Sequence, residues 1–262
     1  MKEDVFLRNE IFSRYGAVKR ARGCFLYTAK NVRLTDLYLD GGRAILGWGG
    51  GSAFTMLKNA LSRGITGSYI TDYSYRLEKA VSDLLSSPRK VFAFPSKKLA
   101  LETALKLFPE NTSFWKPWLP SSPEWEKVDA LLLELPFAWF PETVLLALKK
   151  DFPESSLPGT INLSAPMEAA LSRSCYDTKA ALLDRSEKDW FLWDKELTPY
   201  WQRRGPYLYI KKDVIKEEDY SRFVLHMLDS GVVVNPHYTG ASIVPYGADR
   251  GVFTALKNAP FA

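Results

Sequence analysis

The chain has 262 residues, 46% hydrophobic and 25% charged, with a formal net charge of +5 at pH 7. This is the composition of an ordinary soluble globular protein, and the length allows one large domain or a large and a small one. Apolar runs end well short of the ~20 residues that span a membrane. The N-terminal sequence MKEDVFLRNEIFSRYG has no continuous apolar segment of the signal-peptide kind. We therefore expect a cytoplasmic protein that does not insert in a membrane.

The basic charge is a weak signal for nucleic-acid binding. A sequence pI near 9.0 and the stretch KRARG favour it, but the other lysines and arginines are interleaved with acids. Nucleic acid is therefore not the expected partner. Cys24 and Cys175 match no metal or redox spacing, and His226 and His237 are the only histidines. We expect reduced thiols and no metal site.

The first third of the chain predicts helices around a small hairpin. In chain order we expect a helix stopping near Gly16, a hairpin of Phe25–Tyr27 and Leu34–Leu39, a glycine-dense loop at 47–51, and helices over about Ser52–Arg63 and 74–87.

A strand, a turn and a helix are then expected in VFAFPSKKLALETALKLF, residues 91–108. Ser96 is a good helix N-cap, and apolar residues follow it at helical spacing. Lys97 and Lys98 oppose the positive end of the helix dipole, which an anion such as phosphate would turn to advantage. The alternative is that both side chains simply reach into water.

The remainder predicts a second buried strand and a compact C-terminal unit. The expected segments are an irregular stretch over 109–123, a strand over Ala130–Leu135, helices over about Glu142–Lys150 and Ala165–Leu183, and a strand, helix, strand, strand, helix order in the final third.

The order of these segments resembles the class III aminotransferase family of pyridoxal-phosphate (PLP) enzymes, particularly its glutamate-1-semialdehyde aminomutase branch. Residues 21–47, with Asp36 after a hairpin, are similar to the family's N-terminal segment. Residues 91–108 are similar to its phosphate-cradling strand, turn and helix, with Ser96 at the serine of the S-G-T-E-A motif. Residues 222–259 resemble its C-terminal domain.

The resemblance implies an α/β protein of PLP fold type I. That fold has a mostly parallel large-domain sheet, a small α+β domain made from both chain ends, and a homodimer with active sites at its interface. We assign residues 1–46 and 201–262 to the small domain and residues 47–200 to a reduced large domain.

The chain also departs from the family's pattern. Lys97, Lys98 and Leu99 replace the motif's Gly-Thr-Glu, so charge would have to hold a phosphate without a glycine-lined turn. PLP chemistry needs a Schiff-base lysine and a carboxylate on the ring nitrogen. Neither an apolar run ending in aspartate nor a lysine after a strand follows Leu135, so the catalytic section is interpreted as deleted.

Lys179 and Glu134 are candidate substitutes for the missing lysine and aspartate, and His237 is a candidate ligand-facing residue. Lys179 has Asp177 nearby but fits the exposed face of a helix better. Glu134 ends the second strand, where it could replace the aspartate, although a structural acid is the commoner role. His237 follows Asn235 and Pro236, where the family's chain returns to the active site, which makes it the better ligand-facing histidine; a structural role is again commoner.

The sequence thus predicts a shortened, degenerate aminotransferase-like protein without its lysine. Its function would be binding or assembly, with an anion pocket at Ser96, Lys97 and Lys98 for a phosphate-bearing molecule, and with PLP absent or bound non-covalently. One alternative is an active PLP-dependent aminotransferase or aminomutase with a relocated lysine. The other is a homodimeric interaction protein that uses the aromatic stretch FWKPWLP and binds no small molecule.

Overall fold

The computed structural model describes residues 2–49, 51–67, 69–119, 124–153 and 156–261. The chain divides into two compact units: Gly50–Asp184, the central unit, and Met1–Gly49 with Arg185–Ala262, the chain-end unit. The corresponding boundaries predicted from the sequence fall after residues 46 and 200. Residues 185–200 belong to the chain-end unit because their tryptophans pack there: Trp190 on Tyr246 and Trp193 on Phe253, with ring centroids 5.8 and 5.5 Å apart.

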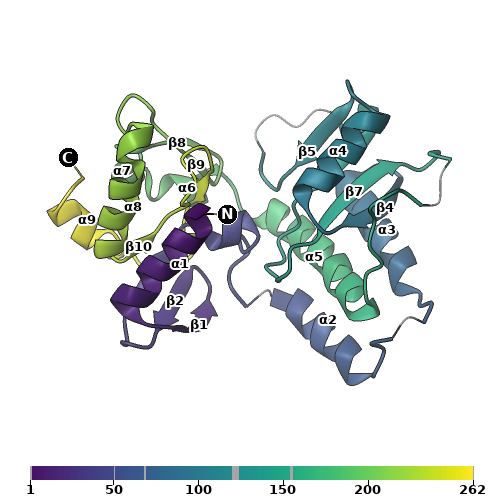
Figure 1. The fold of residues 1–262 in the computed structure, drawn as a ribbon, viewed down its shortest axis with the longest axis horizontal. Helices are drawn as coiled ribbons and strands as arrows, with labels where there is room; N and C mark the ends of the chain where they lie inside the picture. The colour runs from purple at the N-terminus through teal and green to yellow at the C-terminus, as the bar shows by residue number, and fades with distance from the viewer. Residues whose placement is uncertain (1, 50, 68, 120–123, 154–155, 262) are drawn as a thin grey trace. The chain divides into compact units, whose positions relative to one another are not determined.

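The central unit is a four-stranded sheet with helices (Figure 1). Its elements are α2 (Gly51–Ser62), α3 (Tyr73–Leu85), β4 (Arg89–Phe94), α4 (Lys97–Leu107), β5 (Thr112–Trp115), η2 (Trp125–Lys127), β6 (Ala130–Leu133), β7 (Val144–Lys149) and α5 (Ala165–Asp184). The strand order is β4-β7-β6-β5. Strands β4, β5 and β6 run in one direction, and β7 runs against both of its neighbours. The expected mostly parallel sheet is therefore mixed.

Side-chain alternation along the strands builds two apolar layers. Leu131 and Leu133 of β6 join the core cluster that includes α2, α3 and α5 residues, whereas Ala130 and Leu132 join the cluster that includes α4 residues. Helices α2 and α3 both pack on α5 (Figure 1). With both faces covered, β6 is apolar and buried at every position.

Two segments of this unit also differ from their predicted structure. The helix predicted over about Glu142–Lys150 is strand β7, because its apolar run is buried between β4 and β6 and pairs with both. The stretch 109–123, expected to be irregular, contains strand β5, which pairs in parallel with β6. Its residues 120–123 lie outside the described residues.

The chain-end unit contains two small sheets, β1-β2-β3-β10 and β11-β9-β8. Its elements are α1 (Lys2–Tyr15), β1 (Val18–Arg22), β2 (Phe25–Thr28), β3 (Arg33–Asp36), η1 (Leu39–Gly42), α6 (Glu187–Phe191), α7 (Asp194–Leu197), β8 (Trp201–Arg204), β9 (Tyr207–Ile210), η3 (Glu217–Asp219), α8 (Tyr220–Asp229), β10 (Val232–Val233), β11 (Ser242–Ile243) and α9 (Thr254–Asn258). The hairpin predicted from the sequence is β2 and β3. The predicted strand, helix, strand, strand, helix order is confirmed from β9 onward, and strand β8, which was not predicted, precedes it and pairs with β9.

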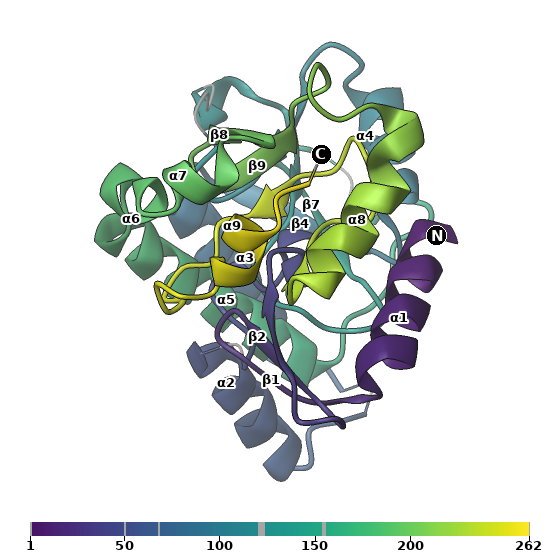
Figure 2. The same ribbon diagram turned by 90° about the vertical axis from the view of Figure 1, so that its left-hand side faces the viewer.

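Both chain ends contribute to this unit's structure. Strand β3 pairs in parallel with β10, although their residues are nearly 200 positions apart. The last turns of α1 and α8 also meet, since Tyr15 Oη donates to Leu228 O and Arg14 pairs with Asp229; Figure 2 shows both helices. Across the described residues of both units, the helices are too short or too polar to cross a membrane.

Candidate functional site

The turn between β4 and α4 carries the predicted anion-site residues. Ser96 is the N-cap of α4, as predicted: its backbone is extended (φ −158°, ψ 150°) and its Oγ accepts a hydrogen bond from Leu99 N at 3.3 Å. This bond satisfies one of the amide groups that have no partner within the helix. The N–H groups of Lys97 and Lys98, at the first two helical positions, belong to the same set and would suit an anion.

The two lysines of this turn have different surroundings. Lys97 forms an ion pair with Glu134 Oε1, and its ammonium lies 4.9 Å from the centre of the Phe114 ring. The Lys98 side chain is 86% exposed, with a distant pairing to Glu102 at 3.9 Å. The sequence left open whether both lysines reach into water. In the structure Lys98 does, whereas Lys97 lies against the protein.

Glu134 also pairs with a second lysine, Lys116, which directly follows strand β5. Lys116 Nζ lies 2.8 Å from Glu134 Oε2, so one carboxylate stands between two ammonium groups. Burial raises the pKa of Glu134, but the charges of Lys116 and Lys97 and their hydrogen bonds outweigh it and hold that pKa below its usual value. The lysine–glutamate–lysine cluster thus carries a net charge of +1.

The cluster lies at one edge of the sheet. Lys97, Lys116 and Glu134 follow β4, β5 and β6 directly or within three residues, and these strands run in the same direction. Their carboxyl ends therefore meet at one edge, which is where open α/β sheets bind ligands. Net positive charge and the first amides of α4 would suit an anion at this edge.

Lys179 does not belong to this sheet edge: it is an exposed residue of helix α5. Its Nζ donates to Asp83 O at 3.3 Å, and the nearby Asp177 instead receives hydrogen bonds from the first residues of α2, with Ala53 N at 3.2 Å. Lys179 and Asp177 therefore bond to different helices and do not form a lysine–carboxylate pair.

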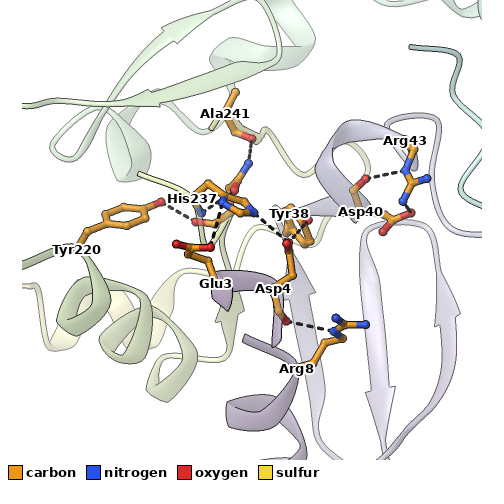
Figure 3. Close-up of polar contacts among 10 residues, drawn as sticks. Glu3, Asp4, Arg8, Tyr38, Asp40, Arg43, Tyr220, His237 and Ala241 are labelled. Atoms are coloured by element: carbon orange, nitrogen blue, oxygen red, sulfur yellow. Dashed lines mark hydrogen bonds and ion pairs between the residues drawn. The ribbon is translucent and has the colours of Figure 1, made fainter. Parts of the chain in front are cut away.

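His237 belongs to the chain-end unit, between β10 and β11. Its Nε2 lies 3.1 Å from Asp4 Oδ1, and its Nδ1 lies 3.9 Å from Glu3 Oε2 (Figure 3). The Asp4 carboxylate also accepts from Tyr38 Oη at 2.9 Å. His237 therefore links the first turn of α1 to the C-terminal segment, and its ligand-facing role stays a prediction.

Lys116 is the member of the cluster that the sequence did not single out. It directly follows a strand that was read as irregular because prolines and aromatic residues surround it. A lysine just after a strand is the available signal, and it becomes visible only once Thr112–Trp115 is recognised as that strand.

Solved structures with a similar fold cover nearly the whole chain. An ornithine aminotransferase from Plasmodium yoelii matches with a TM-score of 0.64 at 14% identity over 97% of both chains. The fold is aminotransferase-like. An acetylornithine aminotransferase from Elizabethkingia anophelis gives 0.66 at 13% identity over 97% of both chains, and an omega-transaminase from Sphaerobacter thermophilus gives 0.66 at 11% over 93% of this chain and 91% of that one. At these identities the likeness shows an aminotransferase-like fold and nothing about a reaction.

Sequence comparison finds two spirochaetal relatives. An uncharacterized protein of Treponema pallidum is 27% identical over 90% of this chain and 91% of its own length. An uncharacterized protein of Borreliella burgdorferi is 33% identical over 38% of this chain and 37% of its own. No protein-family model matches the sequence.

An ornithine aminotransferase from Toxoplasma gondii, another solved structure with this fold, has PLP at its active site, so the cluster can be compared with what PLP requires. The cofactor's aldehyde and its ring nitrogen lie on opposite sides of a pyridine ring, and the Schiff-base lysine and the partner carboxylate must bracket that ring. Here Lys97 and Lys116 contact Glu134 directly, the latter at 2.8 Å. No ring fits between groups in contact, so these three side chains do not fit covalently bound PLP as they lie.

Proposed function

We propose that this protein is a non-catalytic binding protein with an aminotransferase-like fold, which holds a phosphate-bearing small molecule at the β4–α4 turn. The observation that supports it is the net positive lysine–glutamate–lysine cluster beside the N-cap Ser96. The phosphate would accept from the first amides of α4 and from the ammonium groups of Lys97, Lys98 and Lys116. PLP would bind, if at all, through its phosphate and without a covalent bond.

The lysine positions support a non-catalytic role. Lys97 and Lys116 are engaged with Glu134, and Lys179 is bonded to the backbone of α3. An ammonium held in an ion pair is a poor nucleophile, because attack on an aldehyde needs the neutral amine. The chain's lysine side chains at this edge are therefore suited to charge recognition.

The anion site is tested by isothermal titration calorimetry, with inorganic phosphate and with PLP as the ligands. We expect the double variant Lys97→Glu and Lys98→Glu to lose measurable affinity for both. A double variant Lys58→Glu and Lys106→Glu changes the net charge equally, but on α2 and the end of α4, and should retain binding. Because Lys97→Glu also faces Glu134, Lys97→Gln is measured as well. Unchanged affinity in the Lys97 and Lys98 variants would refute the site.

An active PLP enzyme is the second candidate, favoured by the aminotransferase-like fold over nearly the full chain. It requires a covalent aldimine, so PLP incubation, borohydride reduction and tryptic mapping separate the two candidates. A permanent mass gain at one lysine would establish the enzyme and identify that residue. Unmodified lysines would support the binding protein.

A homodimer belongs to the proposal too, but the stretch FWKPWLP is a poor interface in this fold. Trp115 is 4% exposed and is part of the core of the central unit, so it serves packing. Pro120, the last residue of that stretch, lies outside the described residues. Light scattering after size-exclusion chromatography measures the oligomeric state directly.

A further inference from the structure

The central unit contains a second feature, a cavity of about 720 Å³ on the α3 and α5 side of β4. Its walls come from the segment before α3, the first turns of α3 itself, residues 90–93 of β4, and the segment 156–163 leading into α5. A volume of this size accommodates a small organic molecule. The cavity shares no lining residue with the lysine–glutamate–lysine cluster.

The charged groups that line this cavity are mostly acidic. Glu78 and Glu168 supply two carboxylates, and Lys90 supplies one ammonium group. Glu78 is already engaged, because its Oε2 lies 3.0 Å from Lys150 Nζ and its Oε1 accepts from Val91 N at 3.4 Å. The Lys90 ammonium donates to the carbonyl oxygen of Phe152.

Glu168 differs from these two groups. Its carboxyl group is half-buried in the first turn of α5 and, within the described part of the chain, forms no hydrogen bond or ion pair. A half-buried carboxylate without a partner is costly, and a cation placed against it would recover part of that cost. The same described residues contain no group of three or more potential metal ligands, so the chemistry favours an organic cation over a metal ion.

The rim of the cavity suits a cation with an apolar body. Tyr69 and Tyr75 line the cavity, and these residues are 85% and 70% exposed. Aromatic faces attract ammonium and guanidinium groups and also stack on flat apolar groups. We propose that this cavity binds an organic cation, a primary ammonium or guanidinium on an apolar body, through the Glu168 carboxylate.

The affinity of such a site depends on pH in a calculable way. Burial raises the pKa of Glu168 to about 7, and only the ionised carboxylate attracts a cation. The other charged or titratable side chains that line the cavity are Tyr69, Tyr75, Glu78 and Lys90. The ionised fraction of Glu168 therefore rises about tenfold between these two pH values, and the affinity should rise with it.

The experiment is a titration with benzylamine, whose ammonium stays protonated from pH 6 to pH 8. Binding is followed in the ¹H–¹⁵N spectrum of the full chain through the amide signals of Ala93, Ile161 and Glu168, which line the cavity. Benzyl alcohol, which has a similar shape but no charge, is the control ligand. We expect benzylamine to shift these signals with about tenfold higher affinity at pH 8, and benzyl alcohol to bind at least tenfold more weakly than benzylamine at pH 8.

Two variants complete the test. Glu168→Gln keeps the shape of the side chain and should weaken benzylamine binding at pH 8 by about tenfold and abolish its dependence on pH. Glu102→Gln removes an equal charge from the exposed face of α4. It should change neither the affinity for benzylamine nor the dependence of that affinity on pH. Equal binding of benzyl alcohol, affinity that does not change with pH, or full affinity in Glu168→Gln would each overturn the proposal.

Discussion

Glu134 and Lys116 meet at the carboxyl ends of two neighbouring parallel strands, with 2.8 Å between Oε2 and Nζ. Each residue directly follows the last paired position of its strand, Leu133 in β6 and Trp115 in β5. The parallel register therefore places the two residues next to each other. Lys97, in the first turn of α4, pairs with the other carboxylate oxygen of Glu134. One carboxylate thereby holds three segments of the sheet edge together.

Replacing Glu134 should destabilise the protein at neutral pH. Glu134→Gln leaves two ammonium groups facing each other without a carboxylate, and we expect a loss of about 1–2 kcal/mol in the free energy of unfolding. The loss is moderate because Lys97 is 44% exposed and water screens part of the interaction. Urea unfolding at pH 7 measures it, and Glu102→Gln is the matched exposed control with an expected change below about 0.5 kcal/mol.

The pH dependence of this loss has a definite sign. The folded-state pKa of Glu134 is lowered, so its contribution is present above its ordinary value of 4.5 and is lost as the pH falls through the folded pKa. The difference between wild type and Glu134→Gln should therefore shrink when unfolding is repeated at pH 3. A difference that stays constant would mean that the carboxylate charge is not what stabilises this edge.

The same substitution should have the opposite effect on anion binding. Removing the carboxylate raises the charge of the cluster from +1 to +2, so we expect the dissociation constant for inorganic phosphate to fall about threefold to tenfold. Calorimetry at low salt measures it, and added salt should reduce the gain. If Glu134→Gln weakens phosphate binding, then the phosphate does not sit at this cluster.

The sequence predicted most of the elements around this cluster because local signals were strong. The N-cap Ser96 and the apolar spacing after it define α4, and an unbroken apolar run defines β6. The same kind of run in β7 was taken for a helix, since a short apolar segment has no decisive period. Only its pairing with β4 and β6 shows that this segment is a strand and not a helix. Such pairing joins segments that are distant in the sequence, so the local pattern does not reveal it.

The site was harder to predict than the fold. The pairing of Lys97 with Glu134 joins residues 37 positions apart, and that of Lys116 with Glu134 depends on the register of β5 with β6. The sequence named Lys97 and Glu134 separately, the first for a phosphate and the second for a ring nitrogen. Their direct contact could not be read from spacing along the chain.

Asp36 should make the stability of the chain-end unit depend on pH. Burial raises its pKa from 3.8 to about 6, against the opposing hydrogen bonds from Leu39 N, Trp48 Nε1 and Tyr38 N. Because the folded-state pKa is raised, the proton stabilises the fold fully below about pH 3.8, and this is lost as the pH rises through about 6.

We therefore expect wild type to gain about 2 kcal/mol relative to Asp36→Asn when the pH is lowered from 7 to 4.5. Urea unfolding at the two pH values measures the difference. Asp249→Asn removes a carboxylate whose side chain is 65% exposed in the same unit, and it should show less than about 0.5 kcal/mol of such change. If the difference in the free energy of unfolding between wild type and Asp36→Asn is the same at both pH values, then the folded-state pKa of Asp36 is not raised.

Asp177 should stabilise the central unit by capping α2 from another helix. Its carboxylate accepts from Ala53 N at 3.2 Å and from Ser52 Oγ, and Arg173 Nε lies 3.1 Å away. We expect Asp177→Ala to cost about 1–2 kcal/mol in urea unfolding. Lys179→Ala, two residues on but exposed, should cost less than about 0.5 kcal/mol. Equal losses would contradict the capping role.

The pair of His237 and Asp4 should anchor the first turn of α1 to the C-terminal segment (Figure 3). Burial raises the pKa of Asp4, but hydrogen bonds from Tyr38 and His237 outweigh it, and the net pKa is lowered. Its contribution is therefore present above the ordinary value of 3.8 and is lost as the pH falls through the folded pKa. A double-mutant cycle of His237→Gln and Asp4→Asn isolates the pair.

We expect a coupling free energy of about 0.5–1 kcal/mol at pH 7, because the two side chains are 37% and 30% exposed. The coupling should be smaller at pH 3. A cycle of Arg222→Gln with Asp219→Asn, which form an exposed ion pair at the start of α8, serves as the control. An absence of coupling at pH 7 would contradict the anchoring role of His237.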